Sequence, residues 1–360
     1  MAKIQFSVSM AIVLFFMASC IKNKTTHTFS ITRPEYAVKE EVYKNIKTNP
    51  STAIVSPGKM FILGNRIFLA EKNKGIHIIN NSNPSNPINE SFIPIPGSED
   101  VLVKNNTMLV DCYMDLLSID ISNPMDCKLI HVSNNVFPER RYVNGYSLDT
   151  SMVVTNWITK DTTVEDDAYY HHYAGTKMEV NVMSGTDNFN SGSTTNGVGG
   201  SMARFVQVQN YLYTVSHSTL RVFNISNPVV PVFEKEMPLS WNVETIYALH
   251  NHLFIGTQTG MMIVNINNPI APVHTGSFAH ANVCDPVIAD DKFAYVTLRS
   301  GTICQGFLNE LDIIDIQNMS APNLLIKYPF TNPHGLSKDG ELLFICDGDG
   351  GLKIFDAKNV

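Results

Sequence analysis

Three features are missing from this sequence, and each absence excludes a class of protein. After the N-terminal region it has no run of about 20 apolar residues that could cross a bilayer. It has no C-x-x-C spacing of the kind found in zinc and redox sites. Its charge is sparse, with 16% charged residues and a net charge of -7 over 360 residues. Because this balance gives no broad basic field, we expect no nucleic-acid partner. The 44% hydrophobic content is instead typical of a globular chain.

The N-terminus carries an export signal. Lys3 precedes an apolar run over residues 6–17, which is too short for a resident membrane helix and matches a secretory h-region. Met17-Ala18-Ser19-Cys20 follows and resembles the lipobox of bacterial lipoproteins. The resemblance implies that residues 1–19 are removed and that Cys20 is acylated, which would anchor the chain to a membrane without spanning it. The alternative is a plain secretory signal with an incidental cysteine.

Residues 20–35 are then expected to be the lipidated cysteine and a short tether. Ile21 is not the aspartate that retains lipoproteins at an inner membrane, and Lys22 and Lys24 are not an acidic surface-export tag. By this analogy we expect a cell-envelope protein at the outer membrane, on its periplasmic side or at the cell surface.

A phrase of alternating apolar residues that ends in a turn recurs along the chain. Residues 117–124 read LSIDISNP, and residues 262–269 read MIVNINNP. The period-2 alternation predicts a strand, which Asn-Pro ends because proline lacks a ladder donor and asparagine bonds its own backbone. Seven copies carry their Asn, or Ser in the degenerate third copy, at positions 83, 123, 184, 227, 268, 318 and 359.

Each phrase belongs to a four-strand unit. A strand, a polar turn and a second strand precede it, as at residues 101–110, and a further short strand follows it, as at residues 128–132. Four strands in about 40 to 45 residues are typical of a β-propeller blade. The phrases resemble LVIVD repeats over residues 50–360, and this resemblance implies an exported bacterial or archaeal propeller while saying little about chemistry.

We therefore predict an all-β fold with a single seven-bladed β-propeller over residues 36–360. The seventh unit ends without its fourth strand. We predict that the segment from Tyr36 to Ile46 supplies that strand and closes the ring.

One polar residue in each unit is predicted to line the top mouth of the central channel. Each stands six positions before the second hairpin-turn residue of its unit, and the seven are Lys59, Asp100, Asn144, Arg204, Thr245, Asp285 and His334. They could bind a small anionic or polar ligand, or a cation near Asp285 and Asp100. The alternative is a wet channel with a polar rim and no site. The sequence predicts no cofactor and no metal site.

Two insertions, at about residues 158–174 and 299–310, are predicted to rise over the same face. The first ends in an aromatic run that we expect to contact a partner: Tyr169, Tyr170, His171, His172 and Tyr173. A solvated loop without a partner is the alternative. Cys284 and Cys304 both belong to the top face and can form a disulfide, whereas Cys112 and Cys127 lie near opposite faces and are predicted to be unpaired.

No Ser-His-Asp arrangement and no phosphate loop is present. We therefore expect a monomeric, non-enzymatic binding or scaffold protein that engages a protein partner or a small polar ligand through its top face. The alternative is a hydrolase or lactonase-like propeller with its site around Asp285, His334 and Arg204.

Overall fold

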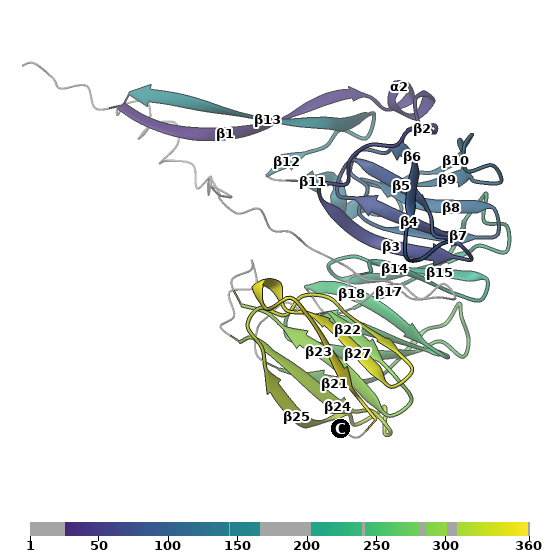
Figure 1. Cartoon of the computed structure of the whole chain (residues 1–360), viewed down its shortest axis with the longest axis vertical. Helices are drawn as coiled ribbons and strands as arrows, with labels where there is room; N and C mark the ends of the chain where they lie inside the picture. The colour runs from purple at the N-terminus through teal and green to yellow at the C-terminus, as the bar shows by residue number, and fades with distance from the viewer. Residues whose placement is uncertain are drawn as a thin grey trace, which may run out of the picture. The chain divides into compact units, whose positions relative to one another are not determined.

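Antiparallel β-strands make up most of the structure. A computed structural model describes residues 26–143, 145–165, 203–239, 242–280, 286–300 and 308–358. The chain divides into two compact units, residues 1–35 with 157–186 and residues 36–156 with 187–360, and we describe each by itself. The second unit contains every sheet that carries the repeat phrase (Figure 1). In the described residues, no helix has the length and apolar character needed to cross a membrane.

Six antiparallel sheets of the predicted kind lie in the described residues, and their strands follow the order of the chain except for β2 in sheet 1. Sheet 1 comprises β3 (Pro57–Leu63), β4 (Arg66–Glu71), β5 (Gly75–Asn80) and β6 (Ile88–Pro94), with β2 (Asn49–Pro50) beside β6. Sheet 2 comprises β7 (Val101–Lys104), β8 (Thr107–Cys112), β9 (Asp115–Asp120) and β10 (Lys128–Ser133). Sheet 3 comprises β14 (Phe205–Val208), β15 (Tyr211–Val215), β16 (Thr219–Asn224) and β17 (Val232–Pro238).

The remaining three sheets follow in the same way. Sheet 4 comprises β18 (Val243–Leu249), β19 (His252–Thr257), β20 (Gly260–Asn265) and β21 (Val273–Ala279). Sheet 5 comprises β22 (Val287–Ala289), β23 (Phe293–Leu298), β24 (Glu310–Asp315) and β25 (Asn323–Pro329). Sheet 6 has three strands, β26 (Leu336–Asp339), β27 (Leu342–Cys346) and β28 (Leu352–Asp356).

The predicted strand-ending turn is confirmed in every sheet. The last residue of each phrase strand is Asn or Asp, and its Oδ1 accepts the backbone N–H two residues later. The six acceptors are Asn80, Asp120, Asn224, Asn265, Asp315 and Asp356. The Asn of the Asn-Pro pair caps the next turn in the same way, as where Asn123 Oδ1 accepts the N–H of Met125 at 3.1 Å. These local bonds stop each strand at the same point of the repeat.

The core lies between consecutive sheets. One apolar cluster joins sheets 3 and 4, a second joins sheets 4 and 5, and a third joins sheets 5 and 6. Alternation along each strand divides its side chains between two clusters: in β20, Ile263 contributes to the cluster shared with sheet 5 and Val264 to the one shared with sheet 3. Sheets 4 and 5 are therefore blades that bury both faces against their neighbours.

Within the described residues, the predicted third unit contributes no four-stranded sheet between sheets 2 and 3. Sheet 2 contacts sheet 3 directly, because Ser118 Oγ donates to the carbonyl of Pro228 at 3.3 Å and Lys104 Nζ donates to Asn210 Oδ1 at 2.7 Å. The described part of the third unit contains the short strands β11 (Tyr142–Val143) and β12 (Tyr146–Ser147) and the long strand β13 (Met152–Glu165). Six of the seven predicted units are thus present as sheets in the described residues.

The prediction that residues 36–46 close the ring is wrong. The N-terminal strand β1 (Thr26–Val38) pairs with β13 in a two-stranded ribbon, where Thr28 and Thr163 share a hydrogen bond of 2.8 Å. The next residues form the short helix α2 (Lys39–Lys44), in which Lys39 Nζ lies 2.6 Å from Asp115 Oδ2 in sheet 2. Asp115, at the start of the inner strand β9, therefore holds this segment, and the strand pattern of residues 36–46 does not reveal this contact.

Candidate functional site

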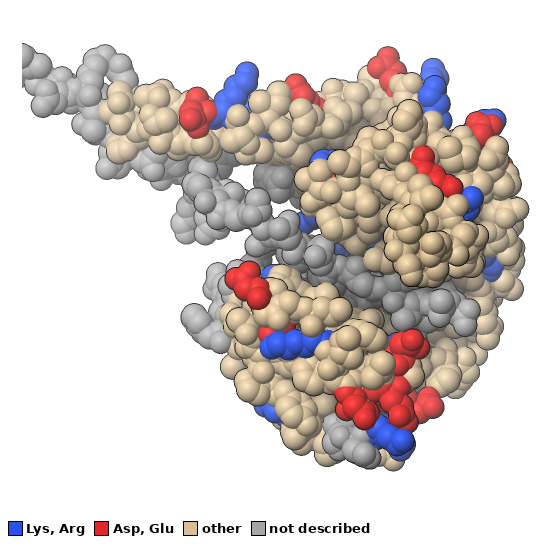
Figure 2. All heavy atoms as spheres, viewed as in Figure 1, with Lys and Arg blue, Asp and Glu red and all other residues tan. Residues whose placement is uncertain are grey.

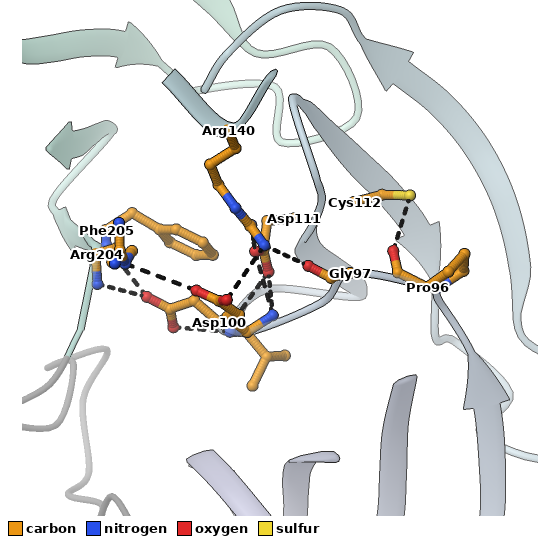
Figure 3. Close-up of polar contacts among 10 residues, drawn as sticks. Pro96, Gly97, Asp100, Asp111, Cys112, Arg140, Arg204 and Phe205 are labelled. Atoms are coloured by element: carbon orange, nitrogen blue, oxygen red, sulfur yellow. Dashed lines mark hydrogen bonds and ion pairs between the residues drawn. The ribbon is translucent and has the colours of Figure 1, made fainter. Parts of the chain in front are cut away.

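Three of the predicted mouth residues meet where sheets 1, 2 and 3 come together. Lys59 lies on β3, Asp100 directly precedes β7 and Arg204 directly precedes β14. Lys59 forms an ion pair with Asp100 Oδ1. Asp100 Oδ2 accepts the backbone N–H groups of Arg204 at 2.9 Å and Phe205 at 3.1 Å (Figure 3). This carboxylate therefore joins three blades, and only 3–4% of either charged side chain in the Lys59–Asp100 pair is exposed.

A second buried pair lies next to the first. Asp111 Oδ1 accepts the backbone N–H groups of Glu99 at 2.9 Å and Asp100 at 2.8 Å. Its Oδ2 pairs with the guanidinium of Arg140, which also donates to the carbonyl of Gly97 at 2.6 Å (Figure 3). Arg140 stands on the 3-10 helix η1 (Pro138–Arg141). Burial raises the pKa of Asp111 and Glu99 adds to that rise, while Arg140 and the two N–H groups oppose it.

The role of Asp111 recurs elsewhere in the molecule. Glu71 at the end of β4 accepts the N–H groups of Val55 and Ser56, and Asp347 after β27 accepts those of Thr331 and Asn332. Each of these carboxylates fixes the loop that enters its own blade, and each has a basic neighbour: His77 and Lys74 beside Glu71, Arg140 beside Asp111, and Lys353 beside Asp347. The repetition assigns Asp111 and Arg140 a structural role.

The buried pairs Lys59–Asp100 and Asp111–Arg140 form one charged cluster together with Glu99 and Arg204. Glu99 and Arg204 are its two solvent-facing members. Their side chains are 32% and 36% exposed, and Arg204 Nε lies 3.7 Å from Glu99 Oε2. Burial would raise the pKa of Glu99, but Arg140, Arg204 and Lys72 together hold it below its usual value, so Glu99 is an anion at neutral pH. This loose pair is the part of the cluster that solvent can reach.

Glu139, next to Arg140 on η1, adds a further acidic group to the cluster. Its two carboxylate oxygens are buried and have no hydrogen-bond partner in the described part of the chain. Burial raises its pKa, against the opposing charges of Arg204, Arg140 and Arg221. Because an ionised carboxylate without a partner is unfavourable, the protonated form of Glu139 is favoured more than in water.

The other predicted mouth residues are placed differently or lie outside the described residues. Thr245 is buried on β18 with 3% exposure. His334 lies beside Arg299, with 3.5 Å between His334 Nε2 and Arg299 Nη1, and its carbonyl accepts the hydroxyl of Thr297. The predicted residues outside the described ranges are Cys20, Asn144, Tyr169, Tyr170, His171, His172, Tyr173, Cys284, Asp285 and Cys304.

The prediction for Cys112 and Cys127 is confirmed, since both are free and buried. Burial, followed by the charges of Asp115 and Asp111, raises the pKa of the Cys112 thiol to about 12. In the described ranges no group of three or more His, Cys, Asp and Glu side chains gathers in a way that could hold a metal ion.

Sequence reasoning missed Glu99, Asp111, Arg140 and Glu139. A signal existed for Asp111, because an acidic residue also ends the second strand of sheet 1 and follows that of sheet 6. Arg140 and Glu139 belong to the irregular third unit, where the repeat gives no register. Glu99 precedes the predicted Asp100 by one residue and carried no signal of its own.

The repeat can be compared directly with a known family. A model of the LVIVD repeat matches residues 59–92, 242–280 and 286–329, which correspond to sheets 1, 4 and 5. This chain is a β-propeller with LVIVD repeats. Matching repeats thus lie on both sides of sheets 2 and 3, the sheets that meet at the charged cluster.

Solved structures with a similar fold share little sequence with the LVIVD propeller. A protein from Lactobacillus plantarum has a TM-score of 0.56 at 10% identity, covering 85% of this chain and 82% of that one. The β-propeller domain of Cps50 (Swd1) from Myceliophteria thermophila has a TM-score of 0.48 at 10% identity, covering 82% and 81%. BamB from Moraxella catarrhalis has a TM-score of 0.45 at 12% identity, covering 82% and 84%. No curated protein matches the chain. At such identities the likeness concerns the fold alone.

The carboxylate of Asp347 in sheet 6 predicts a pH dependence of stability. Burial would raise its pKa, but Lys353 and the N–H groups of Asn332 and Thr331 hold it below its usual value. Ionised Asp347 therefore stabilises the folded state fully above the ordinary Asp pKa of about 3.9. This stabilisation is lost as the pH falls through the lower pKa that Asp347 has in the folded protein. Asp347→Asn should lower stability at neutral pH by about 1–3 kcal/mol.

Chemical denaturation at several pH values checks this expectation. The difference in free energy of unfolding between the wild type and Asp347→Asn should narrow steadily as the pH is lowered. Asp349→Asn, at an exposed position two residues away, is the matched control and should follow the wild type throughout. A gap of constant size down to strongly acidic pH would contradict the assigned role of Asp347.

Proposed function

We propose that this protein is a non-enzymatic propeller of the cell envelope that binds a partner or a small polar ligand through an anionic group at Arg204. The observation that carries the proposal is the division of the charged cluster into two parts. Lys59, Asp100, Asp111 and Arg140 are buried and neutralise one another. The guanidinium of Arg204 is 36% exposed, and it lies 3.7 Å from Glu99 in a loose ion pair.

Arginine suits this role because its planar guanidinium can donate two parallel hydrogen bonds to a carboxylate or phosphate. Asp100 accepts the backbone N–H of Arg204 and so fixes the base of the side chain. A ligand anion would replace Glu99 beside the guanidinium. The buried pairs favour binding over catalysis, since Lys59 and Asp111 are already engaged and neither is free to transfer a proton to a substrate.

The charge distribution also favours a compact anionic group over a nucleic-acid backbone. On the face drawn in Figure 2, the described Lys and Arg side chains are interspersed with Asp and Glu and form no continuous basic field. A single exposed guanidinium within a neutral cluster selects one anionic group and cannot follow a chain of phosphates. We therefore propose a carboxylate- or phosphate-bearing small molecule, or a protein side chain of the same chemistry.

Calorimetric titration of the full chain with succinate, and separately with inorganic phosphate, tests the site. At least one of these anions should bind the wild type, and Arg204→Ala should abolish binding because the bidentate donor is removed. Arg204→Lys should retain weak binding through its charge alone. Arg66→Ala removes an arginine paired with Glu90 in sheet 1 and is the control that should bind as the wild type does.

Two results would overturn the proposal. Unchanged anion affinity in Arg204→Ala would place binding elsewhere. Turnover of an ester or lactone substrate that is lost in His334→Ala or Asp285→Ala would instead support the hydrolase alternative.

We propose that Cys20 is acylated and anchors the chain to the outer membrane. The support comes from the apolar run and from the Met17-Ala18-Ser19-Cys20 sequence. Expressed in a bacterium, the full chain should partition into the detergent phase of a Triton X-114 extract, and Cys20→Ser should move it to the aqueous phase. Cys346→Ser is the matched control, since it removes a thiol of the propeller and should leave partitioning unchanged. Detergent partitioning of Cys20→Ser equal to the wild type would refute the anchor.

A further inference from the structure

Among the described strands, the outer strand of sheet 6 is paired on one side only. β28 pairs with β27 on one side, and no described strand pairs with its other side. In the other five sheets the corresponding third strand is covered by a fourth strand: β6, β10, β17, β21 or β25. β28 thus presents unpaired backbone N–H and C=O groups, which are a template for the addition of another strand.

The side chains of β28 are also unusually exposed for this position of the repeat. Leu352, Ile354 and Phe355 are 63%, 56% and 41% exposed. The corresponding residues of β16 are almost fully buried: Leu220 and Val222 have 0% exposure and Phe223 has 5%. An apolar strand with a free edge is a liability in solution unless something covers it.

β28 is a close chemical copy of β16. β28 reads LKIFD, and the last five residues of β16 read LRVFN. In order, the two strands share a leucine, a basic residue, a β-branched aliphatic residue, a phenylalanine and an Asn or Asp that forms the same turn. The strand that covers β16 therefore indicates what β28 is suited to bind.

That covering strand, β17, complements β16 at three positions. Glu236 lies opposite Arg221 and accepts from its Nε at 2.7 Å. Met237 lies opposite Leu220. Phe233 lies opposite Phe223, with 5.7 Å between the ring centroids in an edge-to-face arrangement. Cross-strand pairs of this kind are the units that stabilise and select a strand.

An added strand could complement β28 at the same three positions. Lys353 corresponds to Arg221, and it remains 36% exposed while its Nζ contacts Asp347 at 2.5 Å. Phe355 borders a cavity of about 150 Å³ whose other walls include Tyr328, Phe330 and Leu343. Because directly opposed residues share one face of a sheet, a side chain opposite Phe355 would face this cavity.

We propose that β28 binds an extended, antiparallel segment of a partner protein. The segment would place an aromatic residue opposite Phe355, an acidic residue opposite Lys353 and a large apolar residue opposite Leu352. If the segment makes the same bulge that β17 makes against β16, its sequence would be an aromatic residue, two residues of any kind, an acidic residue and an apolar residue. Backbone hydrogen bonds would supply affinity, and these three side chains would supply selectivity.

A partner segment fits this edge better than a second copy of the chain. β28 is only five residues long, and two globular copies joined by one such strand would fall short of the roughly 1,200 Å² that stable interfaces bury. A flexible segment can follow the whole edge and also fill the cavity beside Phe355. The orientation and spacing in the proposal come from a pairing that this chain already makes.

Fluorescence anisotropy with the full chain and a labelled synthetic peptide of residues 232–238, VFEKEMP, tests the proposal. The peptide should bind saturably. The same peptide with Glu236→Lys should bind about fivefold more weakly or worse, because a favourable cross-strand pair becomes a repulsive one. A peptide of residues 323–329, NLLIKYP, carries lysine at the corresponding position and should also bind weakly.

Two variants locate the peptide. Leu352→Ala alters a side chain that is 63% exposed, so the fold should tolerate it, and it should weaken binding severalfold. Leu325→Ala alters a leucine that is 49% exposed on β25, the outer strand of sheet 5, and should leave binding unchanged.

Three results would overturn the proposal. They are the absence of saturable binding, equal losses in Leu352→Ala and Leu325→Ala, and equal affinity for the three peptides. Sedimentation showing a dimer that Leu352→Ala dissociates would overturn the choice of partner by assigning the edge to a second copy.

Discussion

Replacing Asp100 with alanine should destabilise the propeller by about 3–5 kcal/mol, the range observed when one member of a buried ion pair is removed. The substitution would leave the buried ammonium of Lys59 without its counter-charge. It would also leave the backbone N–H groups of Arg204 and Phe205 without their acceptor, at the boundary of sheets 2 and 3. Guanidinium denaturation monitored by fluorescence should show a clear fall in the midpoint.

Two further variants separate this explanation from general sensitivity to mutation. Lys59→Met should cost less, about 1–3 kcal/mol, because Asp100 keeps the three N–H groups that donate to it. Asp126→Ala breaks an exposed ion pair with Lys128 and should leave the midpoint unchanged. A loss in Lys59→Met equal to or larger than that in Asp100→Ala would mean that the backbone contacts of Asp100 are unimportant.

The second large effect is expected at Asp111. Asp111→Ala removes the counter-charge of Arg140, whose side chain is 9% exposed, and the acceptor for the N–H groups of Glu99 and Asp100. We expect a loss of about 3–5 kcal/mol, measured as a lower midpoint of thermal unfolding. Ligand binding at Arg204 should weaken as well, because Glu99 and Asp100 position that residue.

A double variant tests whether the unpaired charge causes the loss at Asp111. Asp111→Ala combined with Arg140→Met removes both charges, so it should be more stable than Asp111→Ala alone. Part of the loss should remain, since the two N–H groups still lack an acceptor. If the double variant is no more stable than the single one, Arg140 is not buried as a charged partner of Asp111.

Local patterns predicted the blades well because each blade is specified by its own residues. The alternation in residues 117–121 identifies the strand, and Asp120 ends it by accepting the backbone N–H of Ser122. The same two signals recur in every sheet of the described chain. They act over short distances, so a single sequence is sufficient to identify them.

The connections between blades were harder to predict because they depend on distant partners. The segment from Tyr36 to Ile46 is held by Asp115, which contacts Lys39 and Tyr43. The next residue, Lys47, lies opposite Lys128 in an isolated bridge. Nothing in the alternation of residues 36–46 indicates these contacts. The third unit has the weakest phrase in the chain, and a degenerate phrase does not establish whether it folds as a blade.

Only part of the candidate site was predicted, because its other contacts also join residues that are distant in the sequence. Counting positions in the repeat placed Lys59, Asp100 and Arg204 at one mouth, and the structure brings them together. The counting of repeat positions did not reveal that Lys59 and Asp100 neutralise each other, because a salt bridge between blades depends on side-chain geometry. The exposed role of Arg204 beside Glu99 follows only from the burial of the other charges.

The contact between sheets 2 and 3 is the central claim, because it creates the charged cluster. Lys104→Cys with Asn210→Cys places thiols across this boundary, where Lys104 Nζ donates to Asn210 Oδ1 at 2.7 Å. The reference pair is His250→Cys with Asp291→Cys, across the boundary of sheets 4 and 5, where His250 Nε2 lies 2.7 Å from Asp291 Oδ1. After treatment with a short bifunctional maleimide, mass spectrometry should identify the cross-linked peptide in both pairs. Cross-linking of the reference pair alone would mean that a further blade separates sheets 2 and 3.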